Sequence, residues 1–558
     1  MPRDDHIDKP YLPNRKDFHL EKGTIVKSLM KKVFAAAAAI ATVFGLAATT
    51  VATANAADNA TLTVSTTDAK FAGKTVNAYK MFSATVSGDG GSKAVSYTLT
   101  DAWKPFFKNS TASGLTGATD ENVNDKANDY VSKLKGEDLV AFATKASNWA
   151  QTKTNGIMAG ATAMVSAGAT NGSYTATFTD LDYGYYVVAV PGATLANASG
   201  QYATLVSVDS TNVNTNIKGD LPTVDKKVQV GGTGKDATDA KIGDTLTFTL
   251  TSTIPDMSAY DTYTFNFKDT LSQGLTFGQV TSVTVDGVTD PLTVNTDYTV
   301  TTPTTSDNTL TVSMKDFKKQ QANAGKKITV TYTATLNKDA VVGGHGNTNS
   351  ATIQYSNNPS SGGTGESEPS KVRVFTYGFT VDKYTGDKYD DDATRLAGAE
   401  FALAPKNGTA MSFVQVDAGS ATANAVYRVA KAGETDTTTT ITTPANGKVV
   451  FQGLENGEYT LTETKAPAGY NKLASAIGVK VDGKNDGTDT TDATVAITYN
   501  NDNGNSYNQT ASNGVIPVQN KSGAILPGTG GMGTIAFTVI GVLVIALGVA
   551  WTLKRKNA

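Results

Sequence analysis

Hydrophobic and polar residues alternate over many short runs of this 558-residue chain. The runs TLTFTLTST (245–253), KKITVTYTATL (326–336) and GEYTLTET (457–464) have a period of two, which is typical of half-buried β-strands. A helical pattern is confined to one N-terminal region, in DAWKPFFKNS (101–110) and in residues 120–151. The pattern therefore predicts a mainly β protein with helical insertions near its N-terminus.

Two recurrences mark domain boundaries within this β-rich chain. The tetrapeptide TVDK occurs at 223–226 and again at 380–383, and a Ser/Gly/Pro-rich linker (355–372) precedes the second copy. Short strands separated by Gly, Asn and Asp turns favour stacked β-sandwiches. We therefore expect three tandem immunoglobulin-like β-sandwich domains, the first with the helical insertions, at residues 57–219, 220–373 and 374–523.

The N-terminal 56 residues read as a leader and signal peptide. A basic stretch and an apolar core precede the small-residue site Ala54-Asn55-Ala56, so we expect cleavage before Ala57 and export of the rest. Polar residues precede this unit, and translation from Met1 or from Met30 stays open.

The C-terminal residues 524–558 combine three features in a fixed order. The pentapeptide LPGTG consists of Leu526, Pro527, Gly528, Thr529 and Gly530. An apolar segment (534–553) long enough to span a bilayer follows it, and then the basic residues 554–556, which hold that end in the cytoplasm. The apolar segment also excludes a dinucleotide-binding glycine motif, which needs an amphipathic helix in a βαβ unit. This order resembles the sortase signal of Gram-positive surface proteins, and the resemblance implies cleavage between Thr529 and Gly530 with Thr529 held as a thioester.

Composition excludes several classes of function. A net charge of −3 argues against nucleic acid as a partner. Only His345 follows Met30, which leaves no basis for a histidine-based catalytic triad or a zinc site, so a secreted hydrolase lacks its catalytic cluster. The acidic stretch 386–398 lacks EF-hand spacing and is expected to be a solvated loop. We expect no enzyme activity towards other molecules, no metal and no cofactor.

Cysteine is absent, although secreted β-proteins usually depend on disulfides. The segment GEYTLTETKAPAGY (457–470) suggests another kind of staple, because it fits the pattern Y-x-L-x-E-x-x-A-P-x-G-Y. It resembles the E-box of sortase-assembled pilins and of collagen-adhesin B-type domains. Strand alternation points Glu463 the same way as Tyr459 and Leu461, into the core, where burial favours a protonated carboxyl.

Two further residues complete this predicted site. Lys383 shares a strand face with Phe379 and Val381, so its amine is expected to be buried and neutral. Asn520 lies near the last strand with the parity of its apolar neighbours. A buried amine can attack the amide carbon while the acid moves protons and ammonia leaves. The resemblance likewise implies a Lys383–Asn520 isopeptide bond promoted by Glu463.

The second domain repeats this design with other residues. TFNFKDTLSQGLTF (264–277) resembles the F-x-D-x-L-x-x-G-L segment of pilin middle domains and makes Asp269 the acid. Face parity favours Lys226 over Lys227 as the amine, and Asn349 over Asn357 as its partner. Each cross-link would close a loop of more than 120 residues, which by analogy with disulfides restrains the unfolded chain by roughly 5 kcal/mol. The first domain has no E-box match, and whether it has a cross-link stays open.

The junction of the first two domains, STNVNTNIKGDLPTVDKKV (210–228), contains a candidate acceptor lysine. Backbone pilins carry a V-x-V-Y-P-K motif at this junction, and Lys218 occupies the corresponding place with Val213 at the first position. Asn216 and Ile217 replace Tyr-Pro, which is a departure from the motif. Position before TVDKK favours Lys218.

On these motifs the chain is identified as a member of the sortase-assembled major (backbone) pilins, the fimbrial shaft subunits of Gram-positive bacteria. The resemblance implies a secreted, cell wall-anchored surface pilus in which sortase joins Thr529 of one subunit to Lys218 of the next. The implied partners are a pilus-specific class C sortase, a housekeeping sortase, other copies of the chain, a minor or tip pilin, peptidoglycan and host surface molecules. The alternative is a monomeric LPXTG wall-anchored adhesin, and a reactive Lys218 distinguishes the two.

Overall fold

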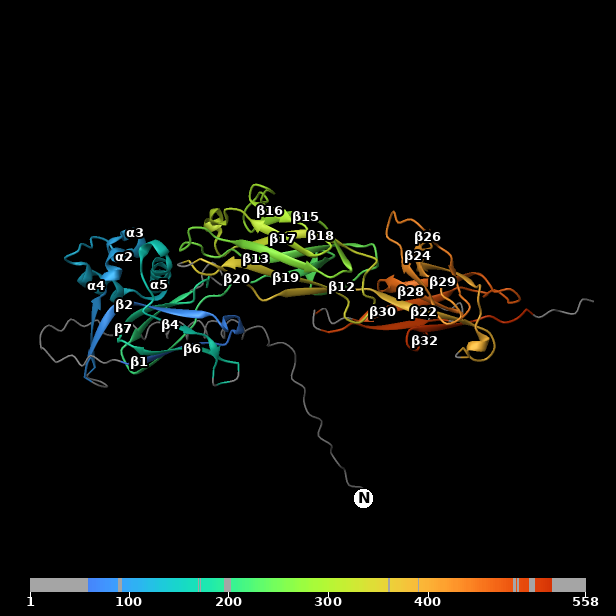
Figure 1. Ribbon diagram of the computed structural model, residues 1–558, viewed down its shortest axis with the longest axis horizontal. Helices are drawn as coiled ribbons and strands as arrows, with labels where there is room; N and C mark the ends of the chain where they lie inside the picture. The colour runs from blue at the N-terminus through green and yellow to red at the C-terminus, as the bar shows by residue number, and fades with distance from the viewer. Residues whose placement is uncertain are drawn as a thin grey trace, which may run out of the picture. The chain divides into compact units, whose positions relative to one another are not determined.

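The computed structural model describes residues 59–88, 93–168, 170, 172–194, 202–359, 362–389, 391–484, 488, 491–500 and 507–523. Over these residues the chain is mainly β, as the alternating pattern predicts, and its α-helices lie between residues 104 and 151 (Figure 1). The chain divides into two compact units. The first holds the residues up to Asp236, Leu246–Ala334 and Thr348–Val372, and the second holds Ala237–Thr245, Thr335–Asn347 and the residues from Arg373.

The predicted signal peptide, the LPGTG residues and the apolar segment 534–553 lie outside the described residues. Among the helices that the structure describes, none combines the length and the apolar character needed to cross a bilayer.

The N-terminal part of the first unit contains two sheets with strand orders β5-β6-β1-β9 and β3-β2-β7-β8, and β4 pairs with β2. Its strands are β1 (Ala60–Thr66), β2 (Thr75–Ser87), β3 (Ala94–Leu99), β4 (Ala161–Met164), β5 (Ser166–Ala167), β6 (Tyr174–Leu181), β7 (Gly184–Ala189), β8 (Ala203–Val208) and β9 (Asn212–Asn216). Alternate residues of β1 are buried, which places Leu62 and Val64 in a core shared with Val188 of β7. One apolar layer therefore joins the two sheets.

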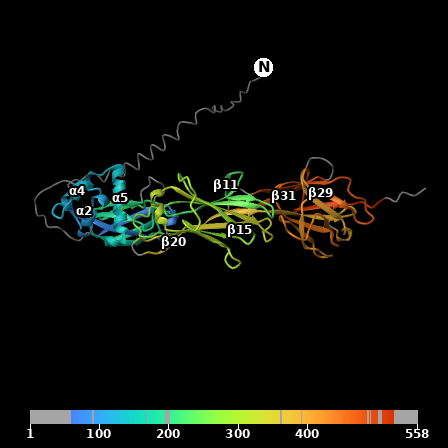
Figure 2. The ribbon, with the colours of Figure 1, turned by 90° about the horizontal axis from the view of Figure 1, so that it is seen from above.

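Four helices cover the other face of the β2–β7–β8 sheet, and Figure 2 shows α2, α4 and α5 grouped together. They are α2 (Lys104–Lys108), α3 (Ser110–Ser113), α4 (Val123–Lys133) and α5 (Gly136–Gln151). Residues 120–151 thus form two helices, and the break falls at Gly136, whose φ of +53° suits glycine. Because sheet and helices enclose β7 from both sides, all six of its residues are buried.

The remaining strands of the first unit also form two sheets, and their orders are β11-β10-β13-β18-β15 and β19-β14-β17-β16, with β20 paired to β19. The strands are β10 (Asp225–Val230), β11 (Thr233–Lys235), β13 (Thr245–Thr253), β14 (Phe265–Leu271), β15 (Leu275–Val285), β16 (Tyr298–Thr301), β17 (Thr309–Met314), β18 (Lys327–Leu336), β19 (Asn347–Ser356) and β20 (Thr364–Glu366). Every second residue of β18 is buried, as its period of two predicts.

The second unit contains the sheets β26-β24-β25-β28-β22-β33 and β27-β23-β29-β30-β31-β32, and β12 pairs in parallel with β21. Its strands are β12 (Ala237–Asp239), β21 (Ser370–Phe375), β22 (Tyr377–Tyr384), β23 (Glu400–Pro405), β24 (Phe413–Asp417), β25 (Ala425–Val429), β26 (Thr437–Thr438), β27 (Ile441–Thr442), β28 (Lys448–Leu454), β29 (Gly457–Lys465), β30 (Ile477–Lys484), β31 (Thr494–Tyr499), β32 (Gln509–Thr510) and β33 (Val515–Gln519). One core between the sheets contains apolar residues of both.

Short 3-10 helices complete the fold: η1 (Ala69–Phe71), η3 (Asp101–Trp103), η4 (Lys153–Asn155), η5 (Phe317–Asn323) and η6 (Asp392–Thr394). In the second unit, β22 and β33 lie side by side and parallel. An early strand and the last strand of this region are therefore neighbours.

Candidate functional site

Lys226, Asp269 and Asn349 meet in the core between the two sheets that contain β10 and β14, and we call them the middle cluster. All three side chains have no exposed surface. Lys226 comes from β10, whereas Asp269 and Asn349 come from the adjacent antiparallel strands β14 and β19 of the opposite sheet. The Nζ atom of Lys226 lies 2.5 Å from Oδ2 of Asp269. The cluster therefore spans the sandwich from one sheet to the other.

Strand alternation explains which candidates reach this cluster. Val224, Lys226 and Val228 are buried, whereas Lys227 is half-buried and pairs with Asp236 at 2.5 Å. The second-choice amide, Asn357, is half-buried, whereas Asn349 is fully buried. The backbone N–H of Asn357 donates to the carbonyl of Gly363.

Tyr332 of β18 is a fourth member of this site that sequence reasoning missed. Its hydroxyl oxygen lies 2.9 Å from Nζ of Lys226 and accepts a hydrogen bond of 2.6 Å from Nδ2 of Asn349. Its ring stacks on Phe248 with 5.4 Å between centroids, and Nζ of Lys226 lies 5.1 Å from each of these two rings. The sequence does place a tyrosine on the buried face of an alternating strand, and a buried hydroxyl needs a polar partner, so this pattern could have indicated a polar group nearby.

The environment of Lys226 disfavours its charged form. Burial lowers the pKa of this lysine, and the attraction of Asp269 offsets part of that effect. Aromatic rings line the site, so there is little solvent to stabilise an ammonium. Lys226 is thereby brought towards the neutral amine that nucleophilic attack requires.

Lys383, Glu463 and Asn520 form a second buried group, the C-terminal cluster. Lys383 lies on β22, Asn520 directly follows the neighbouring strand β33, and Glu463 projects from β29 of the opposite sheet. Nζ of Lys383 lies 3.6 Å from Oε1 of Glu463 and donates to the carbonyl of Val518 at 3.0 Å. Nδ2 of Asn520 donates to Oε2 of Glu463 at 3.1 Å. Burial lowers the pKa of Lys383 to about 8, against the opposing attraction of Glu463.

The A-P-x-G-Y part of the E-box holds the chain beside this cluster. The backbone N–H of Tyr470 donates to Pro467 in a turn, and the next residue, Asn471, donates to the carbonyl of Lys521. The carbonyl of Asn471 accepts from Nδ2 of Asn520 at 2.9 Å, and the N–H of Leu473 donates to Oε2 of Glu463 at 2.7 Å. The turn thus orients both the amide and the acid.

Both clusters contain a carboxyl oxygen and an amide oxygen without a hydrogen-bond donor among the described residues. These atoms are Oδ1 of Asp269, Oδ1 of Asn349, Oε1 of Glu463 and Oδ1 of Asn520, all buried. An unpaired buried acceptor is costly. Among the described residues, each cluster therefore holds two buried acceptor oxygens that lack a donor.

Asp382 departs from strand parity, because it is buried beside Lys383 on β22. Its carboxylate is held by Arg395, whose Nε and Nη2 donate at 2.8 and 2.9 Å. Arg395 also reaches Asp392 in the acidic stretch 386–398, and Asp391 caps η6 there. The described residues contain no group of three or more acidic or histidine side chains suited to a metal ion. These carboxylates therefore bind other groups of the chain itself.

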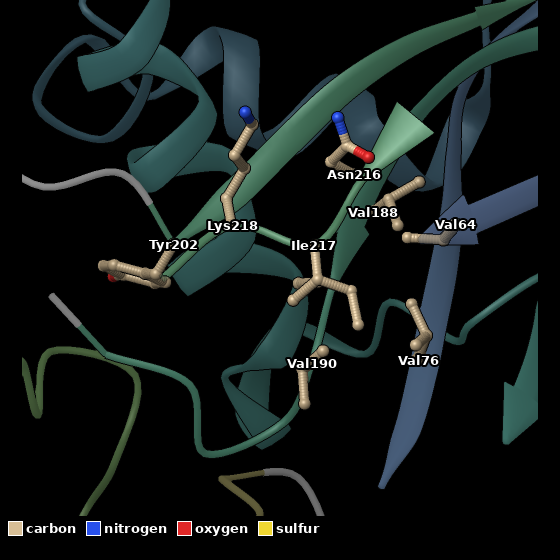
Figure 3. Close-up of a pocket in the computed structure, with 9 residues that line it drawn as sticks. Val64, Val76, Val188, Val190, Tyr202, Asn216, Ile217 and Lys218 are labelled. Carbon is tan, nitrogen blue, oxygen red and sulfur yellow. The ribbon is translucent and has the colours of Figure 1, made fainter. Parts of the chain in front are cut away.

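Lys218 lies between β9 and β10 and lines a small pocket of the first unit. Figure 3 shows its side chain extending away from Ile217 and Val190. The N–H of Ile217 donates to Ser65, and Gly219 packs so closely on Tyr202 that a Cβ atom there would lie 2.5 Å from the Cβ of Tyr202. No ion-pair partner of Lys218 occurs among the described residues. A tethered backbone therefore presents a free amine.

Two family models match this chain. The model described as a Gram-positive pilin backbone subunit 2, Cna-B-like domain matches residues 242–359, and a prealbumin-like fold domain matches residues 382–496. The chain is also 26% identical over 273 residues to the trypsin-resistant surface T6 protein of Streptococcus pyogenes serotype M6. That match covers 46% of this chain and 44% of the relative, so the chain spans less than half of the relative's length.

Solved structures of major pilins resemble the chain. The T6 backbone pilin of Streptococcus pyogenes is 18% identical, with 83% of this chain and 99% of that chain covered and a TM-score of 0.45. The major pilin SpaD of Corynebacterium diphtheriae is 20% identical, with 75% and 90% covered and a TM-score of 0.38.

Proposed function

We propose that this chain, a relative of the Gram-positive backbone pilins, is the major structural subunit of a covalently polymerised surface pilus. Its three domains at 57–219, 220–373 and 374–523 would be immunoglobulin-like sandwiches that carry load rather than catalyse reactions on other molecules. The observation that carries this proposal is the presence of two buried lysine–carboxyl–asparagine clusters. One family match includes Asp269 and Asn349 of the first cluster, and the other includes Lys383 and Glu463 of the second.

Each cluster would form an isopeptide bond. The neutral amine of Lys226 attacks the side-chain carbon of Asn349, and Lys383 attacks that of Asn520. In each cluster the carboxyl group, Asp269 or Glu463, hydrogen-bonds the amide oxygen, a proton passes from the amine to the amide nitrogen, and ammonia leaves. Proximity in a site without solvent supplies several kcal/mol towards the barrier. The bonds would join the first long strand of each sandwich to the last, so a pulling force passes through covalent links.

Polymerisation would use the two chain regions outside these clusters. After export and removal of residues 1–56, the apolar segment 534–553 would hold the chain in the membrane. A class C sortase would cut after Thr529 within Leu526–Gly530 and pass its carbonyl to Lys218 of the next copy. A housekeeping sortase would finally attach the fibre, with a minor or tip pilin, to peptidoglycan. The unpaired amine of Lys218 supports its role as the acceptor.

The test is a Lys218→Arg substitution in the full chain produced by cells with their sortases. Arginine keeps the charge and removes the nucleophile, so an immunoblot of cell-wall extracts should lose its ladder of large species while monomer still reaches the wall. Lys227→Arg is the matched control, because this nearby lysine is already paired with Asp236. A ladder that persists in Lys218→Arg rules out this acceptor. Monomer alone in the unsubstituted strain favours the wall-anchored adhesin.

A further inference from the structure

The two clusters place different groups beside the two nitrogen atoms between which a proton must move. Forming a lysine–asparagine amide requires that one hydrogen move from the attacking nitrogen to the departing nitrogen, which then leaves as ammonia. In the C-terminal cluster one carboxyl is near both nitrogens, because Oε1 of Glu463 lies 3.6 Å from Nζ of Lys383 and Oε2 accepts from Nδ2 of Asn520 at 3.1 Å. A single glutamate can therefore serve both atoms.

Asp269 of the middle cluster has no such double contact. Its Oδ2 atom lies 2.5 Å from Nζ of Lys226, but its other oxygen has no hydrogen-bond partner among the described residues. The departing nitrogen of Asn349 instead donates to the hydroxyl of Tyr332 at 2.6 Å. The same hydroxyl lies 2.9 Å from Nζ of Lys226. One oxygen therefore contacts both nitrogens between which the hydrogen must move.

We propose that Tyr332 is a catalytic residue of the middle-domain cross-link, which relays a proton from Nζ of Lys226 to Nδ2 of Asn349. This role rests on the proposed function, because it needs the Lys226–Asn349 bond. As the Nζ–Cγ bond forms, the hydroxyl oxygen accepts a hydrogen from Nζ and gives its own hydrogen to Nδ2. The Cγ–Nδ2 bond then breaks and ammonia leaves, so the tyrosine returns to its starting state and no other reactant is consumed.

The surroundings of Tyr332 suit a relay. Burial, the nearby charge of Asp269 and a hydrogen bond to that residue raise the pKa of the Tyr332 hydroxyl well above the usual value, so it keeps its proton to donate. The stacked Phe248 ring fixes the orientation of the tyrosine ring. In the described part of the second unit, the side-chain hydrogen bonds of Lys383 and Asn520 involve no hydroxyl group, so the C-terminal cross-link provides an internal comparison.

The test follows both bonds over time in one molecule. The full chain is made by cell-free translation and sampled at intervals, and the peptides joined through Lys226–Asn349 and Lys383–Asn520 are quantified by mass spectrometry after denaturation and digestion. Tyr332→Phe keeps the ring and removes the hydroxyl. We expect the first bond to form at least about 100-fold more slowly, which is the lower end of the range that acid–base groups contribute, and the second to form at its normal rate.

Tyr260→Phe is the matched control. Its buried hydroxyl donates to Ser356 at 3.2 Å in the same domain and touches no member of the cluster, so both bonds should form normally. A normal rate for the Lys226–Asn349 bond in Tyr332→Phe overturns the proposal. Absence of that bond from the unsubstituted chain overturns the cross-link itself, and this role with it, which separates the two failures.

A second measurement covers the case in which Tyr332→Phe disturbs folding. Incorporating 3-fluorotyrosine throughout the chain keeps every hydroxyl and nearly every contact but makes the hydroxyls more acidic. We expect the ratio of the two bond-forming rates to shift several-fold, because only the middle cross-link uses a tyrosine. An unchanged ratio overturns the relay.

Discussion

Glu463→Gln should abolish the C-terminal cross-link with little change in shape. Glutamine can still accept the hydrogen bond from Leu473 that Glu463 receives at 2.7 Å, but it cannot act as the acid between Lys383 and Asn520. The chain should then retain the ammonia that bond formation releases, about 17 Da, in an intact-mass measurement. The other cluster contains no part of Glu463, so its own loss of about 17 Da should remain.

The stability cost follows from the size of the loop that Lys383 and Asn520 would close. Joining them restrains about 140 residues, which by analogy with disulfides lowers the free energy of unfolding by about 5 kcal/mol when the bond is missing. For a domain of this size that corresponds to a fall in melting temperature of roughly 15 °C. Differential scanning calorimetry of the variant and the unsubstituted chain measures the shift.

Glu458→Gln is the control for this experiment. Glu458 lies on the same strand, β29, but is half-buried and pairs with Lys406 at 2.5 Å, so its substitution should leave both the mass and the melting temperature nearly unchanged. A Glu463→Gln chain that still shows both mass losses would refute the assigned role of Glu463. Loss of the bond without a fall in stability would instead refute the loop-entropy estimate.

Two further predictions concern titration and the N-terminal region. In an Asn520→Ala chain, Lys383 stays free, and the free energy of unfolding should rise with pH between about 8 and 10.5, because the native lysine has lost a proton that the unfolded chain still binds. Urea titrations should show a gain of roughly 3 kcal/mol over this range, and Lys383→Met in the same background should remove it. The same dependence of unfolding free energy on pH with and without Lys383 would contradict the prediction. The described residues of 59–219 include no buried lysine or carboxylate, so limited trypsin digestion should cut this region first, whereas cleavage starting beyond residue 220 would show that it is not the weakest.

Much of the candidate site could be predicted from strand alternation. In both clusters the polar residues lie on the same strand face as their apolar neighbours, and their burial follows from that period of two. These residues are Lys226, Asp269 and Asn349 in the middle cluster and Lys383 and Glu463 in the C-terminal cluster. The E-box spacing and the LPGTG order are local patterns that need no fold to be read. The acceptor role of Lys218 and the isopeptide bonds themselves stay predictions.

Strand alternation mispredicts burial or contacts where the partner of a residue comes from another part of the chain. Asp382 is buried although its parity predicts exposure, because Arg395 follows a loop and returns to hold its carboxylate. Tyr332 reads as an ordinary core tyrosine in its own strand. Its contacts with Lys226 and Asn349 arise only when two sheets face each other.

The sequence by itself determined the mainly β class, the helical region, the acidic and amine members of each cluster and the sorting pattern at the C-terminus. These are local properties, set by side-chain period and by motif spacing. Only the tertiary structure decided that Asp269 contacts the lysine nitrogen of its cluster alone, while Glu463 is near both the lysine and the asparagine nitrogens of its own. It also decided that the hydroxyl of Tyr332 on β18 contacts Lys226. Distances across a sandwich depend on how two sheets pack, and no pattern along one strand contains that information.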